Sequence, residues 1–221
     1  MNAVSNVLLL IHIACGMTAL GCGLIPMLSR KGSTLHRVGG RWYVWSMWGV
    51  VFSALPLSIM KQNLFLGTIA IFTAYMIYSG YRSAIRNTVV PQSTADLLMM
   101  GLALLSGAIM ISYGSWLLLG PSGKTGMGII LLVFGTITFL LGVEDLGHWK
   151  KRAQASQKSW MLVHLSRFGG AYIATITAFL VTNVEGIPSL VLWLTPTLIG
   201  TVAIARSSRK WTPPRKSTTN K

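Results

Sequence analysis

Seven long apolar stretches divide this sequence and constrain what it can fold into. They run over residues 4–28, 42–60, 64–81, 95–119, 127–146, 160–181 and 190–205. An α-helix that crosses a bilayer needs about 20 mostly apolar residues, each adding about 1.5 Å. Each stretch meets or approaches that length. We therefore expect an all-α protein, an integral membrane bundle of seven transmembrane helices.

The composition excludes the other broad classes of protein. Hydrophobic residues make up 52% of the 221 residues, and only 10% are charged. Soluble domains carry about 25% charged residues, so this chain cannot cover a water-soluble surface. The apolar content is also too high for a disordered chain.

The basic residues predict an orientation. The net charge is +15, and 16 of the 19 Lys and Arg residues fall in alternate connections or after the last stretch, against two in the other connections. The positive-inside rule then predicts that the N-terminus lies outside and the C-terminus in the cytoplasm. We expect the membrane to be a bacterial inner membrane. We expect a transmembrane domain over residues 1–207 and a basic cytoplasmic tail over 208–221.

The same charge indicates which partners to expect. In a membrane protein, basic loops contact anionic lipid headgroups, so we expect lipids and not nucleic acid. The chain could also form a homo-oligomer or bind a partner membrane protein.

Two histidines lie inside apolar stretches. His12 shares a helix face with Gly16, Ala19 and Gly23, and small residues mark helix contacts in lipid. It is therefore either a neutral imidazole bonded to a carbonyl or hydroxyl of another helix, or a metal ligand or proton relay. His164 lies near the cytoplasmic end of the sixth stretch.

Arg167 is the arginine that we place within a span, nearly one turn beyond His164. A buried guanidinium must be paired or reach water. We expect Glu144 or Asp145 at the end of the fifth stretch as its partner, with Asp145 preferred because it follows a face of small residues. His148 lies one turn further. The group is either an ion pair that fixes helix register or a polar site open to the cytoplasm.

The first cytoplasmic connection, residues 29–41, holds His36, Arg37 and Arg41 around the pair Gly39–Gly40. Glycines beside basic residues favour a turn that holds a phosphate or lipid headgroup, although a simple positive-inside loop has the same composition. Before the fourth stretch, Ser93 and Asp96 have the spacing of a capping box, so Asp96 is expected to cap a helix.

Two segments carry a resemblance to a known family. The segments LHRVGGRWYV (residues 35–44) and HLSRFGGAYIA (residues 164–174) resemble two motifs of an uncharacterised bacterial family of multi-pass membrane proteins, a domain of unknown function. Members of that family more often carry Met where Phe168 stands. The resemblance implies a membrane fold and marks His36, Arg37, Arg41, His164 and Arg167 as candidates, and it implies no reaction.

The leading hypothesis is a protein that binds a lipid, a small solute or a partner subunit at a polar site on its cytoplasmic half. An enzyme is not expected, because no nucleophile–base pair or metalloprotease motif is visible. The candidate residues are His36, Arg37, Arg41, Glu144, Asp145, His148, His164 and Arg167.

Two other functions stay open. A redox protein would hold haem b or a metal between histidines, with His12, His148 and His164 as candidate ligands. Haem needs axial ligands at compatible depth, so His164 would pair with His148 or His36, and His12 would not join them. A small-solute transporter is the third hypothesis, and the lack of a visible internal repeat counts against it.

Overall fold

The computed structural model describes residues 3–86, 93–121, 123–151 and 159–209. Within these ranges the chain forms seven α-helices and no strand. The helices are α1 (Ala3–Leu28), α2 (Thr34–Met60), α3 (Leu64–Arg86), α4 (Thr94–Leu119), α5 (Thr125–Lys151), α6 (Ser159–Asn183) and α7 (Ser189–Ser208). All seven are long and apolar enough to cross a membrane. The predicted all-α fold with seven helices of membrane-spanning length is confirmed, and these helices are compatible with a multi-pass membrane protein.

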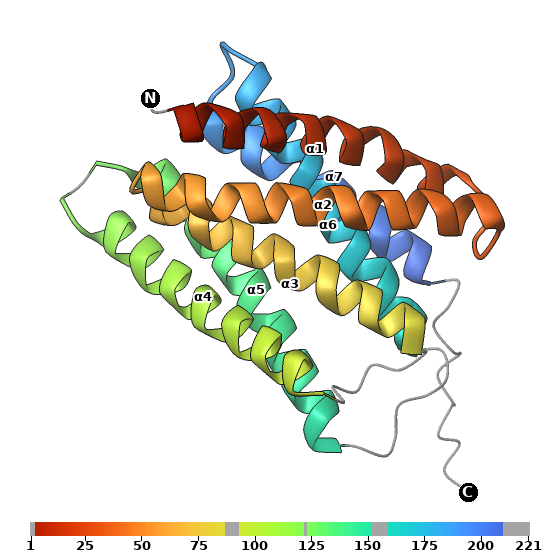
Figure 1. Ribbon diagram of the computed structural model, residues 1–221. Coiled ribbons are helices and arrows are strands. Elements are labelled where there is room, and N and C mark those ends of the chain that lie inside the picture. Colours follow the sequence, from red (N-terminus) through yellow and green to blue (C-terminus); the bar gives the residue numbers. More distant parts are fainter. Residues whose placement is uncertain (1–2, 87–92, 122, 152–158, 210–221) are drawn as a thin grey trace, which may run out of the picture.

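Successive helices run in opposite directions, and α1 to α4 form the near side of the bundle in Figure 1, with α5 to α7 behind them. The most extensive contacts join α1 to α2 and α4 to α5, while α3 packs against α2, α4 and α6. Large apolar side chains such as Leu10, Trp45 and Phe52 lie exposed on the sides. Exposed apolar sides of this kind suit contact with lipid chains.

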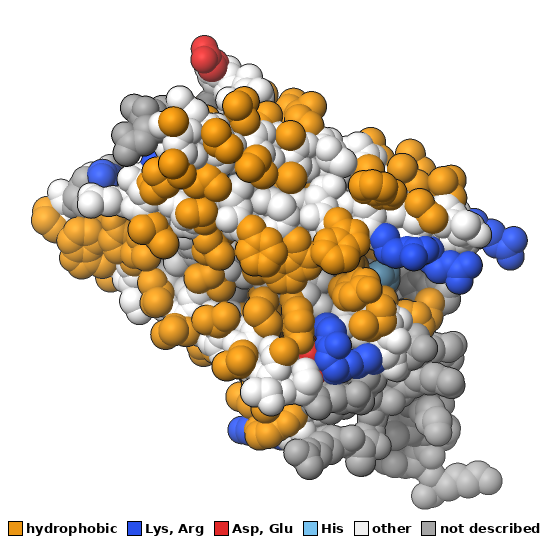
Figure 2. Space-filling view, viewed as in Figure 1, with side chains coloured by type: hydrophobic (Ala, Val, Ile, Leu, Met, Phe, Trp, Pro, Cys, Tyr) orange, Lys and Arg blue, Asp and Glu red, His pale blue; other side chains and the backbone are white. Residues whose placement is uncertain are grey.

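Basic side chains gather at one end of the bundle, which we call the polybasic end. There α1, α3, α5 and α7 end and α2, α4 and α6 begin. Apart from the buried Arg167, the Lys and Arg residues with described side chains at this end are Arg30, Lys31, Arg37, Arg41, Arg82, Arg86, Lys150, Arg206 and Arg209. Figure 2 shows blue side chains gathered at this end and orange hydrophobic ones over most of the remaining face. Of the predicted tail, residues 210–221 lie outside the described part of the chain.

The segment before the second apolar stretch is helical, which corrects one prediction. We expected residues 29–41 to form a connection with a turn at Gly39–Gly40, yet α2 already begins at Thr34. Ser33 caps this helix, because its hydroxyl accepts a hydrogen bond of 3.2 Å from the His36 backbone N–H. Gly39 does allow a close approach, because it lets α2 pack tightly against α1. A Cβ at Gly39 would lie 2.7 Å from the Ile25 side chain of α1.

The start of α4 follows the sequence prediction. Ser93 and Asp96 form a capping box, each side chain accepting from the other's backbone N–H. The Asp96 carboxylate also pairs with Arg82 at 3.0 Å and Arg86 at 2.5 Å, and it accepts from the Tyr78 hydroxyl. Asp96 therefore ties the end of α3 to the start of α4.

Glycines bring α4 and α5 into backbone contact. A Cβ on Gly107 would lie 2.8 Å from the Phe139 backbone nitrogen and 3.0 Å from the Gly135 carbonyl oxygen. Because the atoms it would meet belong to the backbone, they cannot turn aside. Gly107 of α4 and Gly135 of α5 thus determine how closely this pair of helices packs.

We expect Gly107→Ala to lower the stability of the protein in detergent by about 1–3 kcal/mol through overpacking. Gly101→Ala is the matched control on the same helix, because nothing lies within 4 Å of a Cβ there. Alanine has the better helix propensity, so this control should be neutral or raise stability by up to about 1 kcal/mol. Thermal unfolding of both variants gives the comparison, and equal effects would show that the α4–α5 contact is looser than described.

The predicted membrane orientation is tested with reporters fused to the C-terminus. A reporter that works only in the cytoplasm should be active, and one that works only in the periplasm should be silent, because the polybasic end is expected to stay on the cytoplasmic side. The opposite result would show that the C-terminus lies in the periplasm and that the predicted orientation is wrong.

Candidate functional site

Arg167 of α6 lies fully buried beneath the polybasic end, with a relative exposure of 0%. Its Nη2 atom donates to Asp145 Oδ1 at 2.8 Å, and it also lies 3.3 Å from Glu144 Oε2 and from the Leu141 carbonyl oxygen. The prediction that Arg167 pairs with these two acids of α5 is confirmed. Asp145 is the closer and more buried partner, as expected, while the Glu144 side chain is 49% exposed.

Tyr75 of α3 completes this cluster, and the sequence analysis missed it. Its hydroxyl donates to Asp145 Oδ2 and lies 3.0 Å from the Leu141 carbonyl oxygen. Its ring centroid is 5.3 Å from the Arg167 guanidinium carbon, within the range of a cation–π contact. A tyrosine inside an apolar stretch does signal that its hydroxyl needs a partner, but the sequence does not tell which helix supplies it.

The guanidinium of Arg167 keeps unused hydrogen-bond donors. Its Nε and Nη1 atoms are buried and have no hydrogen-bond partner among the described residues. A buried donor without a partner costs about 1–3 kcal/mol, so most native structures avoid it. These donors are the feature of the cluster that points to a ligand.

His148 lies at the rim of the cluster. Its Nε2 atom is 3.8 Å from Glu144 Oε1, one turn away on α5. Both side chains are partly exposed, so this pair borders the surface, while Asp145 and Arg167 lie beneath it.

His36 and His164 come together from α2 and α6. Their ring centroids are 6.3 Å apart, and the rings are tilted by 58°. The His36 Nδ1 atom lies 3.0 Å from the Pro26 carbonyl oxygen, and the His164 Nδ1 atom lies 3.2 Å from the Gly80 carbonyl oxygen. Of the two pairings expected for His164, the structure brings it together with His36.

Three basic residues of the same segment, Lys31, Arg37 and Arg41, lie near His36 in the chain. The Lys31 ammonium donates to the Pro26 carbonyl oxygen at 2.7 Å, and partial burial lowers its pKa. Arg37 and Arg41, the other candidates of this segment, lie exposed on α2. They contribute positive potential at the surface and are not part of the buried cluster.

His12 is hydrogen-bonded to a carbonyl and a hydroxyl of another helix, as the first of the two interpretations of this residue expected. Its Nδ1 atom lies 3.2 Å from the Val50 carbonyl oxygen and 3.1 Å from the Ser53 hydroxyl, both on α2. By helical rise it is about 24 Å before the end of α1, so it lies far from the other two imidazoles. Over the described ranges, no group of three or more His, Cys, Asp and Glu side chains could hold a metal ion.

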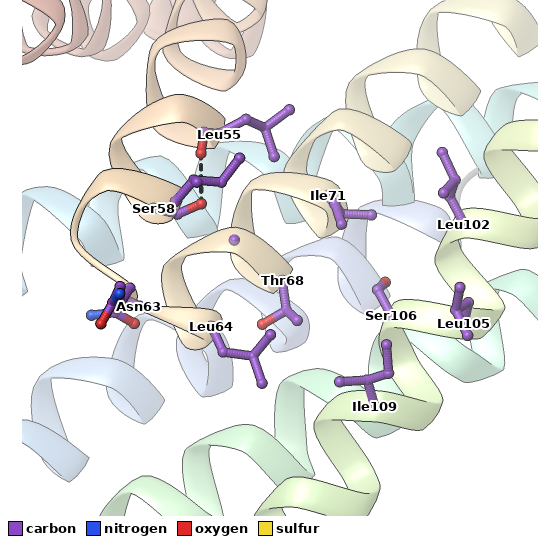
Figure 3. A pocket seen from close by; sticks show the side chains of 13 residues that line it. Leu55, Ser58, Asn63, Leu64, Thr68, Ile71, Leu102, Leu105, Ser106 and Ile109 are labelled. Carbon is purple, nitrogen blue, oxygen red and sulfur yellow. Dashed lines mark hydrogen bonds between the residues drawn. The ribbon is translucent and has the colours of Figure 1, made fainter. Parts of the chain in front are cut away.

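A groove of about 450 Å³ lies at the side of α2, α3 and α4 (Figure 3). Its lining is mostly apolar, and its hydroxyls bond to the backbone of their own helices: Ser58 to Leu55, Thr68 to Phe65 and Ser106 to Ala103. Gln62 and Asn63 are the other polar residues of the lining; they stand where α2 meets α3, and Asn63 Oδ1 accepts from the Leu66 backbone N–H. The mostly apolar lining gives this groove the character of a lipid-facing surface.

Comparison with protein-family models, curated proteins and solved structures finds no match to this chain. The resemblance to a bacterial membrane family stays a prediction. The function is therefore argued from the geometry of the polybasic end.

The Arg167–Asp145 pair predicts strong coupling between the two residues. Because both side chains are buried, Arg167→Ala and Asp145→Ala should each cost about 3–5 kcal/mol, since each leaves a buried charge without its partner. The stability loss of the double variant should be smaller than the sum of the two single losses by at least about 1 kcal/mol. Glu144→Ala, at a half-exposed position, should cost below about 1 kcal/mol. Unfolding in detergent measures all four variants, and additive losses would show that the pair does not interact.

Proposed function

We propose that this protein resides in the bacterial cytoplasmic membrane and binds a ligand with an anionic oxygen group at the polybasic end. The group is a phosphate or carboxylate, carried by a lipid headgroup or a small solute, and Arg167 is its buried donor. One observation carries the proposal: Arg167 Nε and Nη1 are buried and have no hydrogen-bond partner among the described residues. Guanidinium donors match phosphate and carboxylate oxygens in charge and geometry.

The surrounding charge supports an anionic ligand. Asp145 already balances Arg167 on one side of the guanidinium, so the excess charge of this end comes from its exposed basic residues. Clustered basic residues raise the local concentration of anions and favour anionic headgroups. Arg37 and Arg41 act in this way from the surface of α2.

The position of the guanidinium supports access from the α5 side. Glu144 contacts the same Nη2 atom as Asp145 and is 49% exposed, so Arg167 lies one side chain below the surface. Glu144 and His148 are the partly exposed side chains of α5 here, so a ligand that approaches from this side has to displace them. Asp145 and Tyr75 meanwhile hold the guanidinium in place, which lowers the entropic cost of binding.

The proposal is tested by ligand binding to the full-length protein. Inorganic phosphate and succinate represent the solutes, and nanodiscs of phosphatidylglycerol, compared with phosphatidylcholine, represent the headgroup. One of these anionic ligands should raise the thermal stability of the wild type in a saturable way. Arg167→Lys keeps the charge but loses the guanidinium donors, so its affinity should fall by roughly 10- to 100-fold.

Arg206→Lys is the matched control, because it makes the same change at an exposed position of the polybasic end. Its affinity should equal that of the wild type. Wild-type affinity in Arg167→Lys, or a ligand that weakens equally with both variants, would show that anions bind only to the basic surface.

A further inference from the structure

We infer that His36 and His164 form a binding site for a transition-metal centre, in which the Nε2 atoms of both rings ligate one ion, and that haem iron is the occupant that fits best. This inference concerns the imidazole pair and does not depend on anion binding at Arg167. It is carried by how the fold fixes each ring and by how far apart the two rings lie.

The hydrogen bonds fix the tautomer of both rings. A backbone carbonyl can only accept, so the Nδ1 atoms facing Pro26 and Gly80 must carry the protons. The neutral ring then presents its lone pair on Nε2, the atom that ligates metals. An Nδ1–H bond to a backbone carbonyl is also the usual way in which proteins orient a metal-binding histidine. Neither Nε2 atom has a recorded hydrogen bond within the described ranges.

The ring separation matches that of two imidazoles that ligate one ion from opposite sides. Each metal–nitrogen bond is about 2.0–2.1 Å, so two imidazoles on opposite sides have centroids roughly 6.3 Å apart, and a tetrahedral site brings them to roughly 5 Å. The observed separation is 6.3 Å. Opposed imidazoles are the axial ligands of a six-coordinate haem, and haem supplies the remaining four ligands itself. Among the described residues no third His, Cys, Asp or Glu joins the two rings, and a haem site does not need one.

The fold builds this pair from four helices. The acceptors belong to α1 and α3, and the rings belong to α2 and α6. Gly80 lets α6 approach α3, since a Cβ there would lie 3.0 Å from both Arg167 and Phe168. Phe168 also packs edge-on against the His164 ring, with centroids 4.9 Å apart. Such packing keeps the ring in one orientation.

The helix face next to His36 is open at Gly40. Gly40 is one helical turn further along α2, on the same face, and nothing lies within 4 Å of a Cβ at that position. The exposed Arg37 and Arg41 provide positive charge at this end for the carboxylates that haem carries.

His12 shows that a bonded histidine alone does not carry the inference. It too has its Nδ1 atom on a backbone carbonyl, that of Val50, and it is partly buried. No second imidazole is recorded in contact with it among the described residues. It is therefore a matched control for the substitutions below.

The test is titration of the full-length protein in detergent with hemin, followed by absorption spectra before and after reduction with dithionite. We expect one hemin per chain and the sharp reduced bands of a low-spin haem with two imidazole ligands. His36→Ala and His164→Ala should each lose the low-spin spectrum and at least roughly tenfold in affinity. His12→Ala should match the wild type. Free imidazole should restore the low-spin spectrum of His164→Gly, which separates loss of a ligand from loss of folding.

Parallel titrations with Cu²⁺ and Zn²⁺ distinguish haem iron from a free ion. Binding of either ion that requires both His36 and His164 would support the imidazole site and assign it to the ion. The inference is overturned if neither hemin nor an ion binds the wild type, or if binding survives both single substitutions. Hemin that binds without a low-spin spectrum also counts against it. Phosphate binding that depends on Arg167 is unaffected by each of these outcomes, so the two proposals fail separately.

Discussion

The buried ion pair between Arg167 and Asp145 is the interaction on which the rest of the polybasic end depends. Burying two charges is expensive, and their attraction compensates only where the geometry is good and the remaining polar atoms are bonded. Here both oxygens of Asp145 are bonded, one by Arg167 at 2.8 Å and the other by Tyr75 from a third helix, while Nε and Nη1 of Arg167 have no partner among the described residues. The pair therefore fixes the register of α3, α5 and α6 at one depth.

That fixed register positions the histidines. His164 lies one turn before Arg167 on α6, so a slide of this helix would also break its bond to Gly80. His36 is held independently, by the cap at Ser33 and the carbonyl of Pro26. The two rings thus lie together because separate contacts position each of them, those of Ser33 and Pro26 for His36 and that of Gly80 for His164. Among the described residues, Arg167 has hydrogen-bond donors without a partner in the same region. The Arg167 guanidinium and the histidine pair, the two candidate ligand sites, therefore both lie at the polybasic end.

Much of this arrangement follows from the sequence, because membrane helices leave strong local signals. Apolar length predicted the helices, charge alternation predicted the polybasic end, and the cost of burying a guanidinium identified the acids that pair with Arg167. The capping spacing likewise predicted the role of Asp96.

The rest depends on which helices are neighbours. Tyr75 could not be predicted, and the sequence left open whether His164 lies beside His36 or His148, because apolar helices of similar length do not specify their partners. The start of α2 at Thr34 was missed for a local reason: charges and two glycines interrupt the apolar pattern, while the cap at Ser33 and packing of Gly39 against α1 sustain the helix.

The central claim is that Arg167, held in place by Asp145, binds an anionic ligand, and replacing both residues by apolar ones tests it most directly. Buried ion pairs exchanged for hydrophobic residues of similar volume often leave stability unchanged or higher. The double variant Arg167→Met, Asp145→Leu should therefore unfold at or above the wild-type temperature and no longer bind the anionic ligand of the wild type. A variant that folds as well and still binds that ligand with wild-type affinity would contradict the account.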